Sequence, residues 1–305
     1  MPFQYPLPRE VARLLREQQG VVTVAQLLEA GLTRRVCERV TSGWIRLARG
    51  LYLAGSPSFE AATWAASLFC GPNSVIGSSA AAYLAGVLRD PPSEVVIWGR
   101  DQHRSIQIGR WRTRPRRGLR DGRGSPARLS IEEALLDLAR DESLAGTMDA
   151  IARAFVRQYT TPARVLTALD RRERIRHSAQ VRALCSAGKA GIESALEWLF
   201  DERVIVAHRL PAPQRQIRSE EGRIDCHFDA FRVIAELDGI RDHGNWSKDM
   251  LRDNAHALRL DAITLRYGWH AVLQQPCLVA SQIAEALLGR GWTGRPSRCR
   301  LCPRP

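Results

Sequence analysis

The sequence lacks any long apolar run. No stretch of its 305 residues approaches the roughly 18 to 20 consecutive apolar residues that a helix needs to span a bilayer. The first residues, MPFQYPLPREVARLL, also lack the basic region, apolar region and cleavage site of a secretory signal. These absences argue against a helical membrane protein and predict a cytoplasmic one with no membrane partner.

Cysteine is sparse and scattered. The seven cysteines are odd in number and irregularly spaced, which argues against the disulfide framework of a small secreted protein. Cys299 and Cys302 form a CxxC in a stretch rich in Arg and Pro. Because one such pair cannot complete a tetrahedral zinc site and no second pair exists, the sequence alone does not predict that these two cysteines bind a metal.

What the chain has in excess is positive charge. It carries 45 Lys and Arg residues against 32 Asp and Glu residues, a formal net charge of +13, and the excess is supplied almost wholly by Arg. The composition is otherwise that of a globular protein. Basic side chains bind phosphates and release counterions, so the charge predicts a nucleic-acid partner. A genome that favours Arg codons is the alternative explanation.

Residues 9 to 53 have the pattern of a small helical domain that ends in a hairpin. A first amphipathic helix is followed by a second, for which Thr23 is the expected N-cap, and by a third, which Thr33 is expected to cap. Two short strands then turn at Arg49 and Gly50. This order is typical of a winged helix-turn-helix, in which the third helix enters the major groove and the hairpin contacts phosphates.

DNA contacts are therefore expected from the third helix and the hairpin. The side chains concerned are Arg34, Arg35, Arg39, Arg46 and Arg49. The alternatives are that these arginines only face solvent or that the domain binds a protein. The segment GVVTVAQLLEAGLTRRVCERVTSGWIRLARGLYL resembles the N-terminal winged helix of AbiEi-type antitoxins, the transcriptional repressors of type IV toxin-antitoxin systems. The resemblance implies DNA, and also a cognate toxin, as partners.

The middle of the chain, residues 58 to 177, reads as a mixed α/β region. FEAATWAASLFCG, SSAAAYLAG, SIEEALLDLARD and TMDAIARAFVRQY predict helices, whereas EVVIWG and SIQIGRW predict strands. Residues 110 to 128 hold eight arginines and one aspartate. A block of like charge is usually a solvated loop, with added phosphate contacts as the alternative.

Carboxylates gather on one helix and two strands of the last third of the chain. The helix AGIESALEWLFDERV presents Glu193 and Glu197, which are four residues apart and lie on one side. On the following strand Asp225 and His227 share a face. A solvated position is the simpler interpretation of Glu193.

The next strand, FRVIAELD, places Glu236 and Asp238 on one face. If the two strands pair as a hairpin, Asp225 and Glu236 converge, and Glu197 brings a third carboxylate to them. Acidic side chains on buried strands need a cation or an ion-pair partner. Three carboxylates form an oxygen site suited to Mg²⁺ or Mn²⁺.

An ordered set of motifs in this region resembles a nuclease family. The pieces are a Glu on the first helix, Ile-Asp at Asp225, AELDG at 235–239, His243, DMLRDN at 249–254, and Leu-Arg-Tyr at 265–267. They resemble the Vsr-like branch of the PD-(D/E)XK superfamily, related to very-short-patch-repair endonucleases. The resemblance implies a restriction-endonuclease-like α/β fold that hydrolyses phosphodiester bonds.

The resemblance also implies residue roles. Asp225, Glu236 and Glu197 would hold the metal, and Asp238 and His243 would complete the catalytic set. Supporting positions would be Arg252 and Arg266 at phosphates, with Glu193, His227, Asp253 and Asn254 beside the site. Asp238 stands where the superfamily motif usually has a Lys, which helps to orient or deprotonate the attacking water, and this departure puts activity in doubt.

The sequence thus predicts an α/β multidomain protein. Its expected parts are a winged helix-turn-helix at 1–57, a mixed region at 58–177 and an endonuclease-like domain with a basic tail at 178–305. The expected function is that of a DNA-binding, Mg²⁺- or Mn²⁺-dependent endodeoxyribonuclease in a toxin-antitoxin, defence or repair setting. The alternative is an antitoxin-like repressor whose inactive nuclease fold serves for DNA contact or homo-oligomerisation, with Glu236 and Asp238 merely paired to Arg252 and Arg266.

Overall fold

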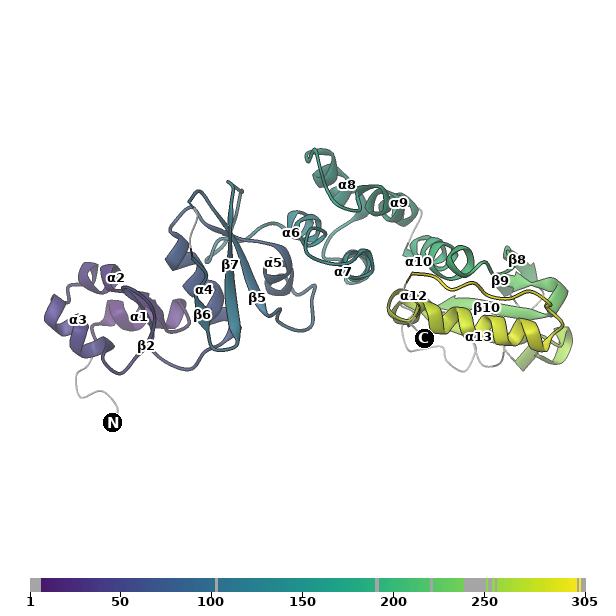
Figure 1. Ribbon diagram of the computed structural model, residues 1–305, viewed down its shortest axis with the longest axis horizontal. Helices are drawn as coiled ribbons and strands as arrows, with labels where there is room; N and C mark the ends of the chain where they lie inside the picture. Colours follow the sequence, from purple (N-terminus) through teal and green to yellow (C-terminus); the bar gives the residue numbers. More distant parts are fainter. Residues whose placement is uncertain are drawn as a thin grey trace. The chain divides into compact units, whose positions relative to one another are not determined.

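The computed structural model divides the chain into two compact units (Figure 1). Unit 1 comprises Met1–Glu142 and Arg171–Arg176, and unit 2 comprises Ser143–Asp170 and His177–Pro305. Both units mix helices and sheets, so the chain is an α/β multidomain protein. The structure describes residues 7–101, 104–189, 192–219, 222–238, 251, 254–255, 257–300 and 302.

Unit 1 begins with three helices and a small sheet. Its first elements are α1 (Arg9–Glu17), β1 (Val21–Thr23), α2 (Val24–Glu29), α3 (Arg34–Thr41), β2 (Ile45–Ala48) and β3 (Leu51–Leu53). The strands form an antiparallel sheet in the order β1-β3-β2. The three predicted helices and the hairpin are present, and β1 adds a strand that the sequence interpretation missed. Gly20 enters β1 with φ +82°, and an added Cβ would lie 3.0 Å from the Ala54 carbonyl oxygen, so the position requires glycine.

A small apolar core and one side-chain cap fix the order of these helices. Val11, Val22, Leu27 and Val40 are buried together between the helices and the sheet. Thr23 forms a capping box in which its hydroxyl accepts from the Gln26 amide and the Gln26 side chain accepts from the Thr23 amide. The two bonds satisfy amides that a helix N-terminus otherwise leaves without partners.

The rest of unit 1 is a second sheet covered by helices. It is built from α4 (Phe59–Cys70), β4 (Val75–Ile76), α5 (Ser78–Leu84), β5 (Glu94–Gly99), β6 (Gln107–Ile108), β7 (Trp111–Arg117) and α6 (Ile131–Leu138). The strand order is β4-β5-β7-β6, with β5 and β7 parallel. Alanines on α4 and α5 are fully buried, because small side chains let these helices approach the sheet closely.

Part of the arginine-rich run is a strand and not a loop, which corrects the sequence interpretation. The segment SIQIGRW, predicted as one strand, turns at Gly109. It is therefore divided between β6 and the start of β7, which pair antiparallel. Along β7 the buried Thr113 alternates with the exposed Arg112 and Arg114. The backbone of β7 can therefore pair with β5 while these arginine side chains reach solvent.

Unit 2 contains helices followed by a four-stranded sheet. Its elements are α7 (Leu144–Val156), α8 (Pro162–Asp170), α9 (Ser178–Lys189), α10 (Ile192–Phe200), the π-helical segment η1 (Asp201–Val206), β8 (Gln214–Ser219), β9 (Gly222–Phe228), the 3-10 turn η2 (Asp229–Phe231), β10 (Val233–Asp238), β11 (Ile263–Gly268), α12 (Trp269–Gln274) and α13 (Pro276–Gly289). The strand order is β11-β10-β9-β8, in which only β10 and β11 run parallel. Helices α10 and α13 pack against this sheet (Figure 1).

Strand β8 was not expected from the sequence. Its residues, QRQIRS, hold one apolar side chain, Ile217, and none is fully buried, so the alternation that marks a strand is weak. In the described part of the chain, no helix has the length and the apolar character needed to cross a membrane.

We predict that the Thr23 cap stabilises α2 and that Thr33, at the N-cap of α3, contributes no comparable side-chain bond. Thr23→Ala should lower the local opening free energy of α2 by about 1 kcal/mol, so that its amides exchange about fivefold faster. Hydrogen-deuterium exchange read by mass spectrometry measures this directly. Thr33→Ala is the matched control, because the Thr33 side chain makes no capping hydrogen bond. Equal acceleration in both variants would contradict the assignment.

Candidate functional site

Two buried carboxylates lie on the central strands of the unit 2 sheet. The register of the antiparallel strands β9 and β10 ends at Ala235 and Cys226, and Glu236 and Asp225 are the next residues on the two strands. Both residues are buried, with 3% and 8% of their surface exposed. The Asp225 Oδ2 accepts a hydrogen bond of 2.9 Å from the Leu237 backbone amide, so the carboxylate takes part in joining the strands.

A third carboxylate is connected to this pair through an amide. The Gln216 side chain donates from Nε2 to the Glu197 Oε1 at 2.7 Å and to the Asp225 Oδ1 at 3.4 Å. Gln216 lies on β8 with φ +52°, and Glu197 lies on α10. The positive end of one amide dipole therefore faces two carboxylates from different elements.

The thiol of Cys226 responds to all three carboxylates. Burial raises its pKa to about 12, and the charges of Asp225, Glu197 and Glu236 act in the same direction, whereas Arg215 opposes them. A single neighbouring group therefore experiences the field of the three acids. Glu197 and Asp225 are joined through Gln216, but the three carboxylates do not form a group of ligand atoms at metal-binding distance among the described residues, so the convergence of Asp225 with Glu236 stays a prediction.

Asp238 has a different environment from the other acids. Arg266 of the parallel strand β11 donates two hydrogen bonds of 3.0 Å to its carboxylate, and both side chains are partly exposed. The pairing of Asp238 with Arg266, one of the alternatives raised by the sequence, is thus observed. Both bonds come from the Nη1 of Arg266, and the paired carboxylate supplies no cation at the position where the nuclease motif usually has Lys.

The remaining predicted residues do not join this group or cannot be described. His227 lies 3.8 Å from Asp229, at the far end of β9. Asn254 is exposed. His243, Arg252, Asp253 and the side chain of Glu193 lie outside the described residues.

The five arginines of the N-terminal domain that are expected to contact DNA are exposed on the surface of unit 1. Arg34, Arg35 and Arg39 project from α3, and Arg46 and Arg49 lie on the hairpin of β2 and β3. Among the described residues, none of the five forms an ion pair.

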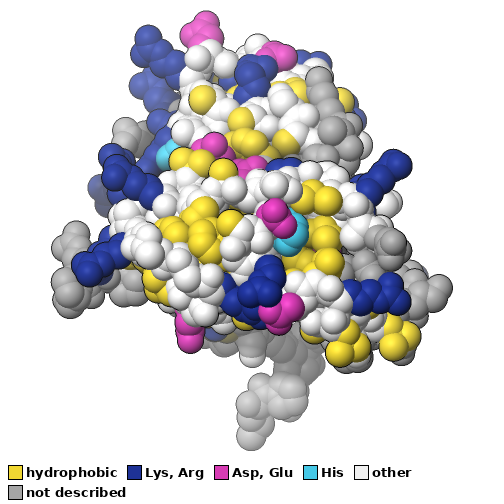
Figure 2. Space-filling model, turned by 90° about the vertical axis from the view of Figure 1, so that its right-hand side faces the viewer, with side chains coloured by type: hydrophobic (Ala, Val, Ile, Leu, Met, Phe, Trp, Pro, Cys, Tyr) yellow, Lys and Arg dark blue, Asp and Glu magenta, His cyan; other side chains and the backbone are white. Residues whose placement is uncertain are grey.

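On the face of the molecule seen in Figure 2, Lys and Arg side chains lie mainly towards the periphery, so the positive charge of that face is not one continuous patch.

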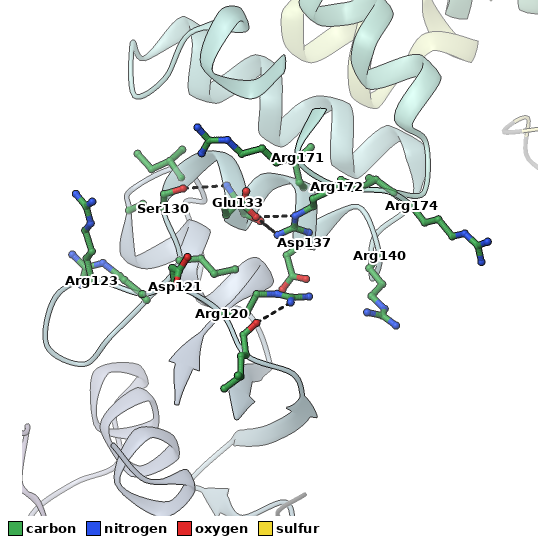
Figure 3. A pocket seen from close by; sticks show the side chains of 18 of the residues that line it. Arg120, Asp121, Arg123, Ser130, Glu133, Asp137, Arg140, Arg171, Arg172 and Arg174 are labelled. Atoms are coloured by element: carbon green, nitrogen blue, oxygen red, sulfur yellow. Dashed lines mark hydrogen bonds and ion pairs between the residues drawn. The ribbon is translucent and has the colours of Figure 1, made fainter. Parts of the chain in front are cut away.

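Unit 1 also contains a broad cleft lined with arginines (Figure 3). Its volume is about 1400 Å³, and eight arginines line it against four acids, Asp121, Glu133, Asp137 and Glu173. The arginines are Arg120, Arg123, Arg128, Arg140, Arg171, Arg172, Arg174 and Arg176. The cleft therefore has a positive lining to which the arginine-rich run contributes three side chains.

Three contacts give the wall of the cleft a defined shape. Arg172 donates from Nε to the Glu133 carboxylate at 2.8 Å. Arg120 lies over the Trp98 ring, 4.1 Å from its centroid, and the Trp98 indole donates to the buried Asp137 at 2.9 Å. Burial, followed by repulsion from Arg172, lowers the pKa of Arg120.

Sequence reasoning missed Gln216 and a second group of potential metal ligands. Gln216 was missed because it has no charge and lies on β8, which the sequence did not predict. Had β8 been recognised, the position of Gln216 opposite the buried Asp225 would have been a usable signal. The second group is formed by His208, Cys277, Cys299 and Cys302. Their wide separation along the chain hid it, and only the CxxC pair was visible.

Comparisons of this chain with protein-family models, with curated proteins and with solved structures find no match. The likeness of its motif residues to AbiEi-type and Vsr-like proteins therefore stays an expectation. Function has to be inferred from the residues and their geometry.

We predict that Asp225 stabilises the sheet mainly as a hydrogen-bond acceptor. Asp225→Ala would leave the buried Leu237 amide without its side-chain acceptor and should lower the free energy of unfolding by about 1–3 kcal/mol. Asp225→Asn keeps a carbonyl oxygen at the same position and should cost clearly less. Urea unfolding followed by circular dichroism compares the two variants. An equal loss in both would show that the negative charge, and not the acceptor, holds the strands.

Proposed function

We propose that this protein binds DNA through unit 1 and that unit 2 hydrolyses a phosphodiester bond with the help of Mg²⁺ or Mn²⁺. The observation that carries the proposal is the position of Asp225 and Glu236 on neighbouring strands directly beyond the Ala235–Cys226 pair, with Glu197 joined to Asp225 through Gln216. Carboxylates buried at one point of a sheet are costly unless a cation or donors compensate them.

The chemistry of the donor set suits a hard divalent cation, although the three carboxylates are not already assembled as a group of ligand atoms in the described part of the chain. Asp225, Glu236 and Glu197 offer carboxylate oxygens, which Mg²⁺ and Mn²⁺ prefer. The Gln216 Nε2 already directs partial positive charge at two of these carboxylates, and its buried Oε1 makes no hydrogen bond with the described residues. A half-turn of this amide would present Oε1 as a fourth oxygen ligand, so Gln216 can suit either the free or the loaded site.

The residues around the site then take distinct roles. Asp225, Glu236 and Glu197 would hold the cation, which supplies Lewis-acid chemistry by polarising the phosphoryl oxygens and offsetting their charge. Arg266 keeps Asp238 oriented at the end of β10. His243 remains the candidate for orienting or deprotonating the attacking water, because Asp238 in its ion pair cannot replace the usual Lys.

The order of elements supports the fold that the motifs imply. In unit 2, a helix bearing Glu197 precedes a mixed sheet in which antiparallel strands carry Asp225 and Glu236, an arrangement compatible with a restriction-endonuclease-like, Vsr-like fold. In unit 1, the succession α1, β1, α2, α3, β2, β3 suits a winged helix with α3 as recognition helix. The arginine-lined cleft of unit 1 would add phosphate contacts.

A second candidate function is an antitoxin-like repressor whose nuclease fold does not cut. The observation that favours it is the Asp238–Arg266 pair at the position of the missing Lys. In that case unit 1 would still bind DNA, and the carboxylates of unit 2 would serve stability alone. Tight promoter binding by a protein that cuts no DNA with either cation would favour this candidate.

The nuclease proposal predicts cation-dependent nicking of supercoiled plasmid. Asp225→Asn and Glu236→Gln preserve shape but remove a charged ligand, so each should slow nicking in Mg²⁺ or Mn²⁺ by at least about 100-fold. Asp229→Asn is the matched control, since this carboxylate follows β9 directly but its side chain is 67% exposed. Nicking that survives both site changes, or that needs no divalent cation, would refute the assignment of these residues.

The DNA-binding proposal predicts a weaker salt dependence when α3 loses its arginines. Replacing Arg34, Arg35 and Arg39 by Ala should lower affinity and reduce the slope of log K against log salt by about 2 to 3, nearly one for each lost phosphate contact. Fluorescence anisotropy at several salt concentrations measures the slope. Arg13→Ala is the control, because Arg13 is already paired with Glu10 and Glu17 on α1. Unaltered DNA affinity in the triple variant would point to a protein partner for α3.

A further inference from the structure

Four side chains from three separate parts of unit 2 meet at one point. His208 follows η1, Cys277 lies in the first turn of α13, and Cys299 and Cys302 belong to the segment after α13. One ligand atom from each residue lies within 4.8 Å of all the others. Among the described residues, no other group of three or more His, Cys, Asp or Glu side chains meets this condition.

Four of the six distances between these atoms are close to those of a tetrahedral zinc site, and the other two are within 4.8 Å. The Cys277 Sγ lies 3.5 Å from the Cys299 Sγ and 3.6 Å from the Cys302 Sγ, and the Cys302 Sγ lies 3.8 Å from the Cys299 Sγ and 3.7 Å from the His208 Nε2. Zinc bonds of about 2.3 Å to sulfur and about 2.0 Å to nitrogen at tetrahedral angles place sulfurs about 3.8 Å apart and sulfur about 3.6 Å from nitrogen. A disulfide would require about 2.05 Å, and all three cysteines are free.

The histidine is already oriented as a ligand. Its Nδ1 lies 3.1 Å from the Val204 carbonyl oxygen, which can only accept, so the proton is on Nδ1 and the Nε2 lone pair faces the thiols. His208 is 3% exposed, and its own carbonyl accepts from the Ser297 amide at 2.8 Å. A ring whose second nitrogen is bound to a backbone carbonyl is the usual support of a zinc ligand.

A cation close by balances the charge that three thiolates would bring. The half-buried Arg203 donates to the Leu273 carbonyl at 2.9 Å, which holds its guanidinium in place. Burial lowers the pKa of Arg203, whereas the charges of Cys277 and Cys299 act in the opposite direction, so these thiols are near enough to influence it. Zinc with three thiolates carries one net negative charge, and Arg203 offsets it.

We propose that His208, Cys277, Cys299 and Cys302 form a structural zinc site that ties the C-terminal segment to the start of α13 and to the end of η1. Three sulfurs and one imidazole in a tetrahedron favour zinc over the oxygen-seeking cations. Four protein ligands fill the coordination sphere, so the site has a structural and not a catalytic role. The proposal does not rest on the nuclease activity of the other site.

The test begins with the metal content of the full-length protein. Purified chain should contain about one zinc per molecule, and Co²⁺ exchanged into it should give the intense visible absorption of a tetrahedral thiolate complex. Cys302→Ser and His208→Ala should each lower zinc affinity by more than the roughly 10- to 100-fold typical for loss of an outer-sphere partner. Cys70→Ser is the matched control, a cysteine outside the cluster and in unit 1.

A second measurement on the unmodified chain does not depend on how the variants fold. Alkylation read by mass spectrometry should find Cys277, Cys299 and Cys302 protected in the zinc-loaded protein, and a chelator should accelerate their modification at least about tenfold while Cys70 is unaffected. Zinc content that is unchanged in Cys302→Ser, absence of both zinc and Co²⁺ binding, or a disulfide among the three thiols would overturn the proposal.

Discussion

The hydrogen bond from the Leu237 amide to the Asp225 carboxylate is the interaction on which the unit 2 site depends. It lies where backbone pairing of β9 and β10 gives way to side-chain contact, directly beyond Ala235 and Cys226. A carboxylate buried at that point is fixed by the backbone and cannot rotate freely. The fold therefore holds Asp225 against β10 whether or not a cation is bound, and Gln216 and Arg223 offset the electrostatic cost of burying its carboxylate.

Positive charge is used in two different ways in this chain. In unit 2, Arg215 and Arg266 are committed to Asp201 and Asp238 and serve to fix acidic side chains. In unit 1, the arginines of α3 and of the hairpin make no ion pair with described residues and face solvent. An excess of arginine alone cannot distinguish these uses, because only the position of each acid decides whether an arginine remains available for a phosphate.

Local patterns in the sequence predicted local structure well. The Thr23 cap, the helices of unit 1 and the antiparallel pairing of the strands that carry Asp225 and Glu236 all follow from spacing within a few residues, where a helical or strand period determines which side chains share a face. The run of residues 110 to 128 was harder, because its charge suggested a loop while pairing with β5 makes part of it the strand β7. Tertiary contact overrode composition there.

Long-range groupings could not be predicted in the same way. Cys302 and His208 are 94 residues apart, and nothing near His208 in the sequence resembles the usual ligand spacing of a zinc site. Strand β8 was missed because its single apolar residue gives no period, although Gln216 on this strand connects Glu197 with Asp225. Both omissions arise where polar side chains, and not apolar ones, determine the fold.

Strand β8 links the two clusters of unit 2. This edge strand buries no residue fully, so hydrophobic packing holds it weakly, and polar contacts must hold it instead. Arg215 bonds Asp201 and the Cys226 thiol, and Gln216 bonds Glu197 and Asp225. His208 lies shortly before β8, and fixing it to the cysteines would limit the freedom of the segment that leads into the strand. A zinc tie at His208 would therefore help to keep Gln216, and through it Glu197, in register with Asp225.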